Sequence, residues 1–137
     1  MDKAMNYVAL AKKARLIELG EEPVGAITRA GKARLVIVAS DSGDHTWRRA
    51  KSFVAGTPQV CIRIPQSKDE LGLAVGRTSL AIAAFTDAAM ALAFLKALPQ
   101  ERYSSELEAL EALSKRLQQR QKEAKAHKRN VKTGKKK

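Results

Sequence analysis

The sequence predicts an α/β domain with helices on both faces of a sheet. Helical and strand-like patterns alternate along the chain up to Leu98, as is typical of this class. Residues 35–39 form a continuous apolar run, the pattern of a strand that is covered on both faces. Hydrophobic residues make up 45 % of the chain but aromatic residues only 4 %, so the core must consist mainly of Ala, Val, Leu and Ile, which suits helices packed on a buried sheet.

Local signals place the elements of the first half of the chain. Residues 2–14 carry apolar side chains at helical spacing, which predicts a first helix. The turn Gly20-Glu21-Glu22-Pro23 predicts the start of a second, short helix to Arg29, because acidic residues and proline favour a helix N-terminus. After the apolar strand, turn and N-cap residue types at 40–44 begin a third helix that ends near Val54.

The same alternation continues in the second half. Residues 60–64 and 79–85 have the composition of strands. Between them, Ser67 and Glu70 fit a capping box, in which the two side chains satisfy the first N–H groups of a helix. That helix should end near Gly76.

Two further helices complete the chain. Asp87 is the predicted N-cap of a helix that ends at Leu98, before a proline. Ser105 and Glu108 fit a second capping box, which predicts the start of the last helix. One face of this helix is marked by leucines at helical spacing: Leu107, Leu110, Leu113 and Leu117.

The length of 137 residues suits one domain with a sizeable core. We expect three parts. A folded α/β domain covers residues 1–98, an amphipathic C-terminal helix covers 99–126, and a basic tail that is disordered when free covers 127–137.

The net charge of +12 is concentrated near the C-terminal end. From Lys115 onward the chain has eleven of its 26 basic residues and one of its 14 acidic residues, so this segment carries +10. A block of positive charge binds phosphate polyanions by releasing condensed counterions. A solvated tail that aids solubility is the alternative. Because the rest of the chain is nearly neutral, the charge distribution favours a nucleic-acid partner.

The residue types argue against an enzyme. The chain has two histidines and one cysteine, and no nucleophile-elbow or phosphate-binding-loop pattern. Asp41-Ser42-Gly43-Asp44-His45 follows a strand, where α/β proteins often bind ligands. Its acids could hold a metal, but these are also turn and N-cap residue types, the interpretation we prefer. Cys61 lies in an apolar run and should be a small buried hydrophobe. No catalytic residue, metal or cofactor is expected.

The sequence also predicts a cytoplasmic protein that binds no membrane. A single cysteine excludes an internal disulfide framework. The N-terminus lacks the basic region and apolar block of a secretory signal. The segment from Leu80 to Leu98 is apolar, but Thr86-Asp87 interrupts it, so we interpret it as a strand followed by a helix.

Two motifs have two interpretations each. Trp47, beside Arg48 and Arg49, either stacks on an unpaired RNA base or anchors its helix to the sheet. Gly72 and Gly76 have the GxxxG spacing that pairs helices in membranes, but their segment is too short and polar to span one. We therefore expect these glycines to permit close packing and to end a helix.

Four segments in a fixed order carry a family resemblance. They are Gly20-Glu21-Glu22-Pro23-Val24, the run from Ala30 to Asp41, Lys68-Asp69-Glu70-Leu71-Gly72 and Ala84-Phe85-Thr86-Asp87. Together they resemble the ribosomal L-seven-Ae family, including its small bacterial members, over about Tyr7 to Leu98. The resemblance implies a three-layer α/β/α sandwich with a mixed central sheet. It also implies binding to kink-turn RNA, a sharply bent internal loop built around sheared G·A pairs.

The resemblance further implies where RNA binds. In the family's kink-turn binders, the turn after Gly20 supplies an Asn-Glu pair and a lysine three residues later, where this chain has Glu22, Pro23 and Ala26. The turn still presents helix N-terminal N–H groups, which bind phosphate. Family members also use the loop before the last strand, and nearby cations are expected to surround the same surface. The implied RNA-binding residues are Lys13, Arg15, Gly20, Glu21, Glu22, Arg29, Lys32, Gly76, Arg77 and Thr78, with Lys128, Arg129 and Lys132 from the tail.

These observations predict a non-catalytic, ribosomal or ribosome-associated RNA-binding protein. The folded domain gives selectivity for structured, kink-turn-like RNA, and the tail gives salt-sensitive phosphate affinity. Ribosomal RNA is the expected partner, and ribosomal proteins are expected at the C-terminal helix. The alternative is a protein-interaction adaptor that keeps the fold, has lost kink-turn recognition and binds a partner through the leucine face of its last helix.

Overall fold

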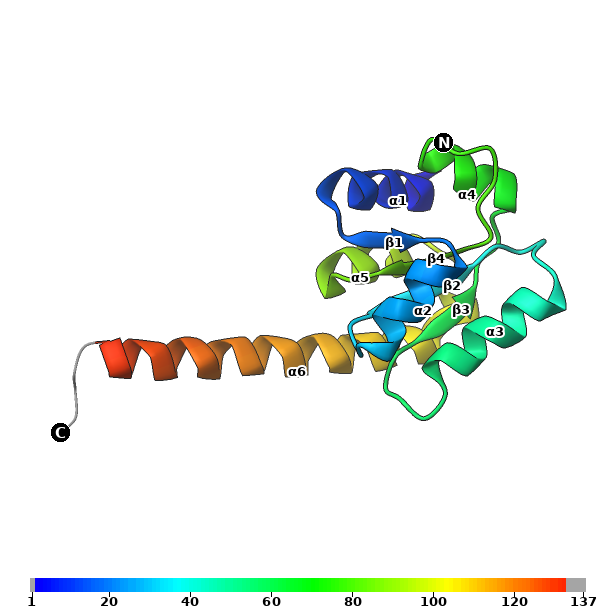
Figure 1. Cartoon of the computed structure of the whole chain (residues 1–137). Coiled ribbons are helices and arrows are strands. Elements are labelled where there is room, and N and C mark those ends of the chain that lie inside the picture. The colour runs from blue at the N-terminus through cyan, green and yellow to red at the C-terminus, as the bar shows by residue number, and fades with distance from the viewer. Residues whose placement is uncertain (1, 133–137) are drawn as a thin grey trace.

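The computed structural model describes the backbone of residues 2–132 and the side chains of residues 2–126. A four-stranded sheet has helices on both faces, which confirms the predicted α/β class (Figure 1). The strands are β1 (Ile17–Leu19), β2 (Leu35–Val38), β3 (Cys61–Arg63) and β4 (Ile82–Phe85). The helices are α1 (Lys3–Ala14), α2 (Glu21–Arg29), α3 (Asp44–Val54), α4 (Lys68–Ala74), α5 (Ala88–Lys96) and α6 (Gln100–Lys132).

The sheet is mixed and has the strand order β1-β4-β2-β3. β4 pairs antiparallel with both β1 and β2, whereas β2 and β3 are parallel. Ile17 of β1 lies opposite Phe85 of β4, and Leu19 lies opposite Ala83, so the two ends of β1 lie at opposite ends of β4. The central strands β2 and β4 are buried along their whole length, as a continuous apolar run predicts.

Two cores, one on each face of the sheet, separate the three layers. Successive side chains of a strand point to opposite faces. Leu35 and Ile37 therefore enter one core, while Val36 and Val38 enter the other. Helices α1, α4 and α5 and the first part of α6 cover the first core, and α2 and α3 cover the second. The three-layer sandwich implied by the family resemblance is confirmed.

Most helix starts follow their local signals. Ser67 and Glu70 form the predicted reciprocal capping box at the start of α4. Asp87 caps α5 through its side chain, also as predicted. α3 begins at Asp44, but its N-cap is Gly43, which contributes no side-chain hydrogen bond. Short-range side-chain hydrogen bonds therefore define the starts of α4 and α5 but not that of α3.

The strands are shorter and more numerous than the sequence patterns predict. β4 begins at Ile82 rather than at Ser79. β1 has only three residues, with the charged Glu18 in its middle, and was not predicted as a strand. It forms because the antiparallel partner β4 satisfies its backbone groups.

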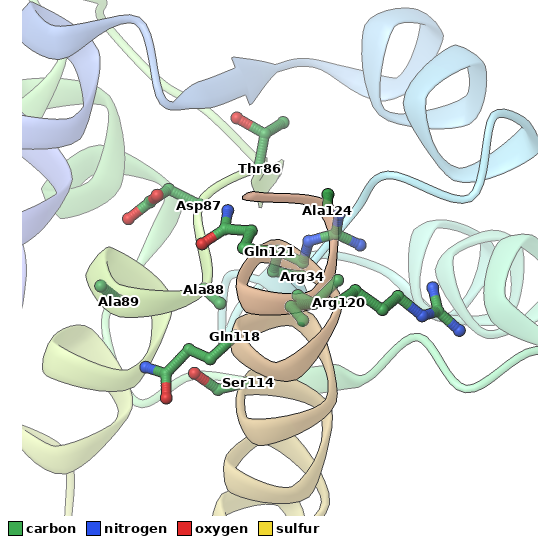
Figure 2. A pocket seen from close by; sticks show the side chains of 11 residues that line it. Arg34, Thr86, Asp87, Ala88, Ala89, Ser114, Gln118, Arg120, Gln121 and Ala124 are labelled. Atoms are coloured by element: carbon green, nitrogen blue, oxygen red, sulfur yellow. The ribbon is translucent and has the colours of Figure 1, made fainter. Parts of the chain in front are cut away.

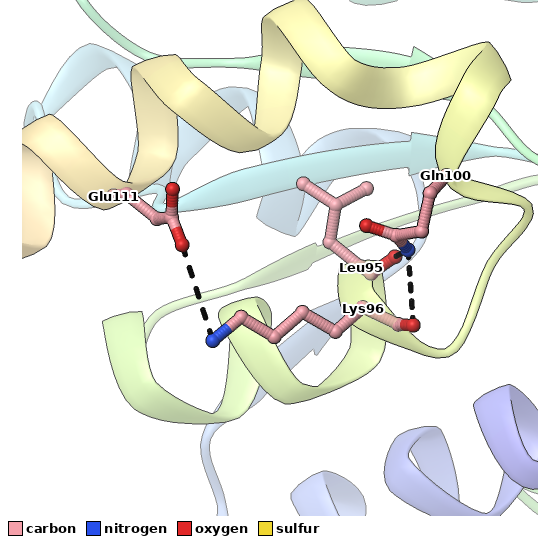
Figure 3. Close-up of polar contacts among 4 residues, drawn as sticks. All are labelled: Leu95, Lys96, Gln100 and Glu111. Atoms are coloured by element: carbon pink, nitrogen blue, oxygen red, sulfur yellow. Dashed lines mark hydrogen bonds and ion pairs between the residues drawn. The ribbon is translucent and has the colours of Figure 1, made fainter.

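The start of α6 differs from the prediction. The helical segment begins at Gln100, but its backbone leaves helical geometry at Tyr103, so the long part of α6 starts close to the predicted Ser105. The capping-box hydrogen bonds expected between Ser105 and Glu108 do not form in the described side chains. The Gln100 side chain donates from Nε2 to the carbonyl oxygens of Lys96, at 3.0 Å, and Leu95, at 3.3 Å (Figure 3). The bond to Lys96 satisfies a carbonyl that the end of α5 leaves open, and the two bonds connect α5 directly to α6.

The first part of α6 belongs to the folded domain. Leu110 is fully buried and Leu113 nearly so, in the core that α5 also covers. Tyr103, where the backbone leaves helical geometry, donates its hydroxyl to a carbonyl of β3 at 2.7 Å, and burial raises its pKa. Lys96 and Glu111 form an ion pair of 4.0 Å between α5 and α6 (Figure 3). The leucine face is therefore not free for a partner protein, and this basis of the adaptor alternative is wrong.

The rest of α6 extends away from the domain (Figure 1). Its backbone reaches Lys132, beyond the expected helix end at residue 126. Within residues 2–132, no helix combines the length and the apolar character needed to cross a membrane.

Candidate nucleic-acid interface

The turn between β1 and α2 presents a helix N-terminus at one end of the sheet. Gly20 has φ +98°, which favours glycine, and its N–H donates to the Ile82 carbonyl at 3.0 Å, which fixes the turn to the start of β4. Pro23 is the third residue of α2 rather than the first. Proline is tolerated there, because the first four N–H groups of a helix have no partner within it. The N–H groups of Glu21 and Glu22 are among these four, an arrangement that binds anions.

The loop after α4 lies against this turn. Gly76 has φ +77°, and Arg77, Thr78 and Ser79 after it are exposed. A Cβ atom placed on Gly20 would lie 4.0 Å from Nη1 of Arg77, so the guanidinium group reaches the start of α2. The structure thus brings together six of the predicted residues. We call them the turn face: Gly20, Glu21, Glu22, Gly76, Arg77 and Thr78.

The structure adds two residues to this surface that sequence reasoning missed. Arg49 of α3 forms an ion pair with Glu21, and its guanidinium lies 5.5 Å from the Phe53 ring centroid. It places a cation beside the start of α2 and offsets the charge of Glu21. Leu73 of α4, one turn before Gly76, is 69 % exposed. Helical spacing from the buried Leu71, Ala74 and Val75 puts Leu73 on the opposite face of α4, a signal that could have indicated its exposure.

Gly72 allows the loop to pack closely on α4. A Cβ atom at Gly72 would lie 2.7 Å from both the backbone nitrogen and the Cα atom of Ser79. No real Cβ atom tolerates such a contact with backbone, so the close packing expected of this glycine is confirmed.

Gly72→Ala should therefore destabilise the fold by about 1–3 kcal/mol, the usual cost of overpacking. The loss is expected even though alanine favours a helix interior over glycine by about 1 kcal/mol. Urea unfolding followed by tryptophan fluorescence measures the change in the free energy of unfolding. An unchanged or higher free energy of unfolding would contradict the tight packing of Ser79 on α4.

Four other predicted residues lie at the opposite end of the sheet. Arg15 ends α1 and precedes β1, whereas Gly20 follows β1. Arg29 ends α2, and Lys32 follows it before β2. The expectation that these cations surround the Gly20 turn is corrected, because β1 and α2 each carry the chain from one end of the sheet to the other. We call Lys13, Arg15, Arg29 and Lys32 the far-end cations.

The predicted tail residues cannot be placed against either surface. The side chains of Lys128, Arg129 and Lys132 lie outside the described residues, although the α6 backbone reaches Lys132. Their contribution to phosphate binding stays a prediction.

Residues 41–45 have structural roles. Oδ1 of Asp41 accepts a hydrogen bond from the Lys68 N–H at 2.8 Å, which ties this turn to the start of α4. Ser42 donates its hydroxyl to the Ala39 carbonyl at 2.7 Å. The interpretation as a turn before α3 is confirmed. In the part of the chain that the structure describes, no three His, Cys, Asp or Glu side chains lie together as metal ligands would.

Trp47 is partly buried against the second core. Nζ of Lys51 and Cζ of Arg63 lie 5.4 and 5.1 Å from its ring centroid. Nη2 of Arg63 also donates to the Ser42 carbonyl at 3.2 Å, which holds the guanidinium in place. Because two cations already lie over the indole, the structure favours the anchoring role of Trp47 over stacking on an RNA base.

Cys61 is a structural residue. Burial raises the pKa of its thiol to about 12, against a lowering effect of Lys51. The thiol is therefore neutral at physiological pH, whereas a cysteine nucleophile acts as the thiolate.

Comparison with known proteins shows the fold. No protein-family profile matches the sequence, and no curated protein matches it. The structure is similar to a protein of unknown function from Bacillus halodurans, with 25 % identity and a TM-score of 0.66 over 71 % of this chain and 97 % of that one. It is also similar to the 15.5kD RNA binding protein of Giardia lamblia, with 21 % identity and a TM-score of 0.59 over 77 % of this chain and 85 % of that one.

Proposed function

We propose that this protein is a non-catalytic, cytoplasmic RNA-binding protein that recognises structured, kink-turn-like RNA at the turn face, with ribosomal RNA as its partner. The observation that carries the proposal is the convergence of Arg77 and the Gly20 turn at one end of the sheet. The fold supports it, because the RNA-binding protein of Giardia lamblia has a similar structure. The net charge of +12 supports it as well.

Recognition at the turn face rests on backbone groups and on Arg77. The N–H groups at the start of α2 bind a phosphate, and the Arg77 guanidinium donates hydrogen bonds to a phosphate or to a guanine edge. Glu22, Pro23 and Ala26 do not supply the amide and ammonium donors of the family pattern. The protein therefore binds the shape of its RNA with fewer side-chain contacts to bases than that pattern provides.

The surroundings of the turn face suit a bent RNA better than a plain duplex. Leu73, exposed near Arg77, offers an apolar contact to a base that a bend has unstacked. The ion pair between Arg49 and Glu21 reduces the repulsion of phosphate by that carboxylate. A regular duplex has no unstacked base, so it gains nothing from Leu73.

Arg77→Gln should weaken binding to a kink-turn RNA about tenfold, because one such contact contributes about 1–3 kcal/mol. Binding to a plain duplex should change little. Fluorescence anisotropy titrations at one fixed salt concentration measure both affinities. Arg102→Gln is the matched control, since it removes the same charge from an exposed position of α6.

The same titrations decide the wider proposal. Wild-type protein that binds neither kink-turn RNA, nor plain duplex, nor isolated ribosomal subunits would exclude the RNA-binding function. Equal losses for Arg77→Gln and Arg102→Gln would place the RNA away from the turn face. Crosslinking of the protein to ribosomal RNA within the subunits tests the proposed partner.

A further inference from the structure

A groove lies between α6 and the end of the sheet opposite the turn face. It consists of two adjoining hollows of about 440 and 180 Å³ that share Arg34, Leu117 and Arg120. Residues 86–89, where β4 turns into α5, line the larger hollow on one side, and residues 114–124 of α6 line it on the other (Figure 2). The smaller hollow also contains Arg116. We call the two hollows together the α6 groove.

The α6 groove has a strong positive charge. Arg34, Arg116 and Arg120 line it, and within residues 2–126 none of them forms an ion pair with a carboxylate. Asp87 is the one acidic residue among its lining, and the Asp87 carboxylate already accepts the Met90 N–H at 2.9 Å. Four further hydrogen-bonding side chains line the larger hollow: Thr86, Ser114, Gln118 and Gln121 (Figure 2).

The α6 groove continues a basic region of the surface. Arg34 directly precedes β2, and its N–H donates to the Phe85 carbonyl at 2.7 Å. Arg34 is therefore at the same end of the sheet as the far-end cations. Cations from α1, from α2, from the start of β2 and from α6 thus gather at one end of the molecule, although they are far apart in the sequence. A phosphate polymer is the ligand whose repeated charges match such a surface.

We propose that the α6 groove binds the phosphate backbone of the same RNA whose bend contacts the turn face. This inference rests on the proposed function. The two surfaces lie at opposite ends of β4, whose four residues span about 14 Å. A kink-turn has a stem on each side of its bend, and a stem longer than this span reaches from the turn face to α6. The domain thus binds both the bend and one of the stems.

The test compares two double variants on α6. Arg116→Gln/Arg120→Gln removes two charges from the α6 groove, whereas Lys115→Gln/Lys122→Gln removes two charges from other exposed positions of the same helix. The probes are kink-turn RNAs in which the stem toward α6 has about 3 or about 15 base pairs, which span at most about 10 or about 50 Å. Circular dichroism checks that every variant is folded, and Arg34→Gln is an independent second variant of the groove.

The groove variant should bind the long-stemmed RNA about tenfold more weakly than wild type. Its slope of log affinity against log salt should be shallower by about 2, because each lost phosphate contact contributes about 0.9. The short-stemmed RNA should show neither change, and the control variant should stay near wild type. Absence of kink-turn binding by the wild type would overturn the proposed function, and this inference with it. Normal wild-type binding with equal effects of the two double variants would overturn the groove alone.

Discussion

Leu110→Ala should lower the free energy of unfolding by about 3 kcal/mol. Leu110 is fully buried, so the substitution removes apolar contacts and leaves a cavity in the core shared by α5 and α6. The same substitution on a helix that did not pack on the domain would lower the free energy of unfolding far less. Urea unfolding followed by far-ultraviolet circular dichroism measures the free energy of unfolding of the full chain.

Leu10→Ala is the matched control for this prediction. It makes the same side-chain change on α1 at a position that is 51 % exposed, and alanine is at least as good a helix former as leucine. Its effect should stay within about 0.5 kcal/mol. An equally small effect of Leu110→Ala would contradict the docking of α6. The docking matters for the proposed RNA contact, because a fixed α6 holds Arg116 and Arg120 at the groove.

The elements with local signals could be predicted from the sequence. Ser67 and Glu70 bond to each other's backbone, and Asp87 caps its own helix, so each start depends on residues within one turn. The continuous apolar run of residues 35–39 indicates by itself a strand that is buried on both faces. The structure has β2 there, at the centre of the sheet. In these cases the residues that indicate the element belong to the same short segment as the element itself.

The elements with distant partners could not be predicted in this way. In β1 the alternation of apolar and charged residues covers only Ile17, Glu18 and Leu19, which is too short to indicate a strand. Its backbone groups pair with β4 from the other half of the chain. The junction between α5 and α6 depends on the Gln100 side chain, which donates to carbonyls at the end of α5. Ser105 has the residue type of an N-cap and lies two residues after the break in helical geometry at Tyr103, so its local signal indicated the restart of the helix but not the preceding turn from Gln100.

The sequence indicated many of the residues of the candidate interface, but it did not indicate which of them lie at the same end of the sheet. Family resemblance indicated the Gly20 turn and the Arg77 loop, and these two segments lie together. Proximity in sequence suggested that Arg15 and Lys32 join them, but the register of β1 with β4 puts both at the other end of the sheet. The strand order decides which segments share an end, and no single segment encodes that order.

Deletion of residues 127–137 should make RNA binding much less dependent on salt. If each of the six cations in this segment contacts a phosphate, the slope of log affinity against log salt becomes shallower by about 5. Affinity at moderate salt should fall by about a hundredfold or more. Kink-turn RNA and plain duplex should lose affinity equally, because phosphate contacts carry no sequence information. The cations are Lys128, Arg129, Lys132, Lys135, Lys136 and Lys137.

Two full-length variants separate the effect of losing the charge of residues 127–137 from the effect of shortening the chain. Replacement of the six cations with glutamine should reproduce the deletion, whereas replacement of the five lysines with arginine should keep the salt slope, since both side chains are cationic. The preference for kink-turn RNA over duplex should survive the deletion, because the proposed function assigns it to the turn face. Arg77→Gln in the truncated protein should then remove that remaining preference. The contrary outcome is a preference that disappears with the tail while Arg77→Gln changes nothing. That outcome would show that the tail distinguishes the two RNAs and that the turn face does not.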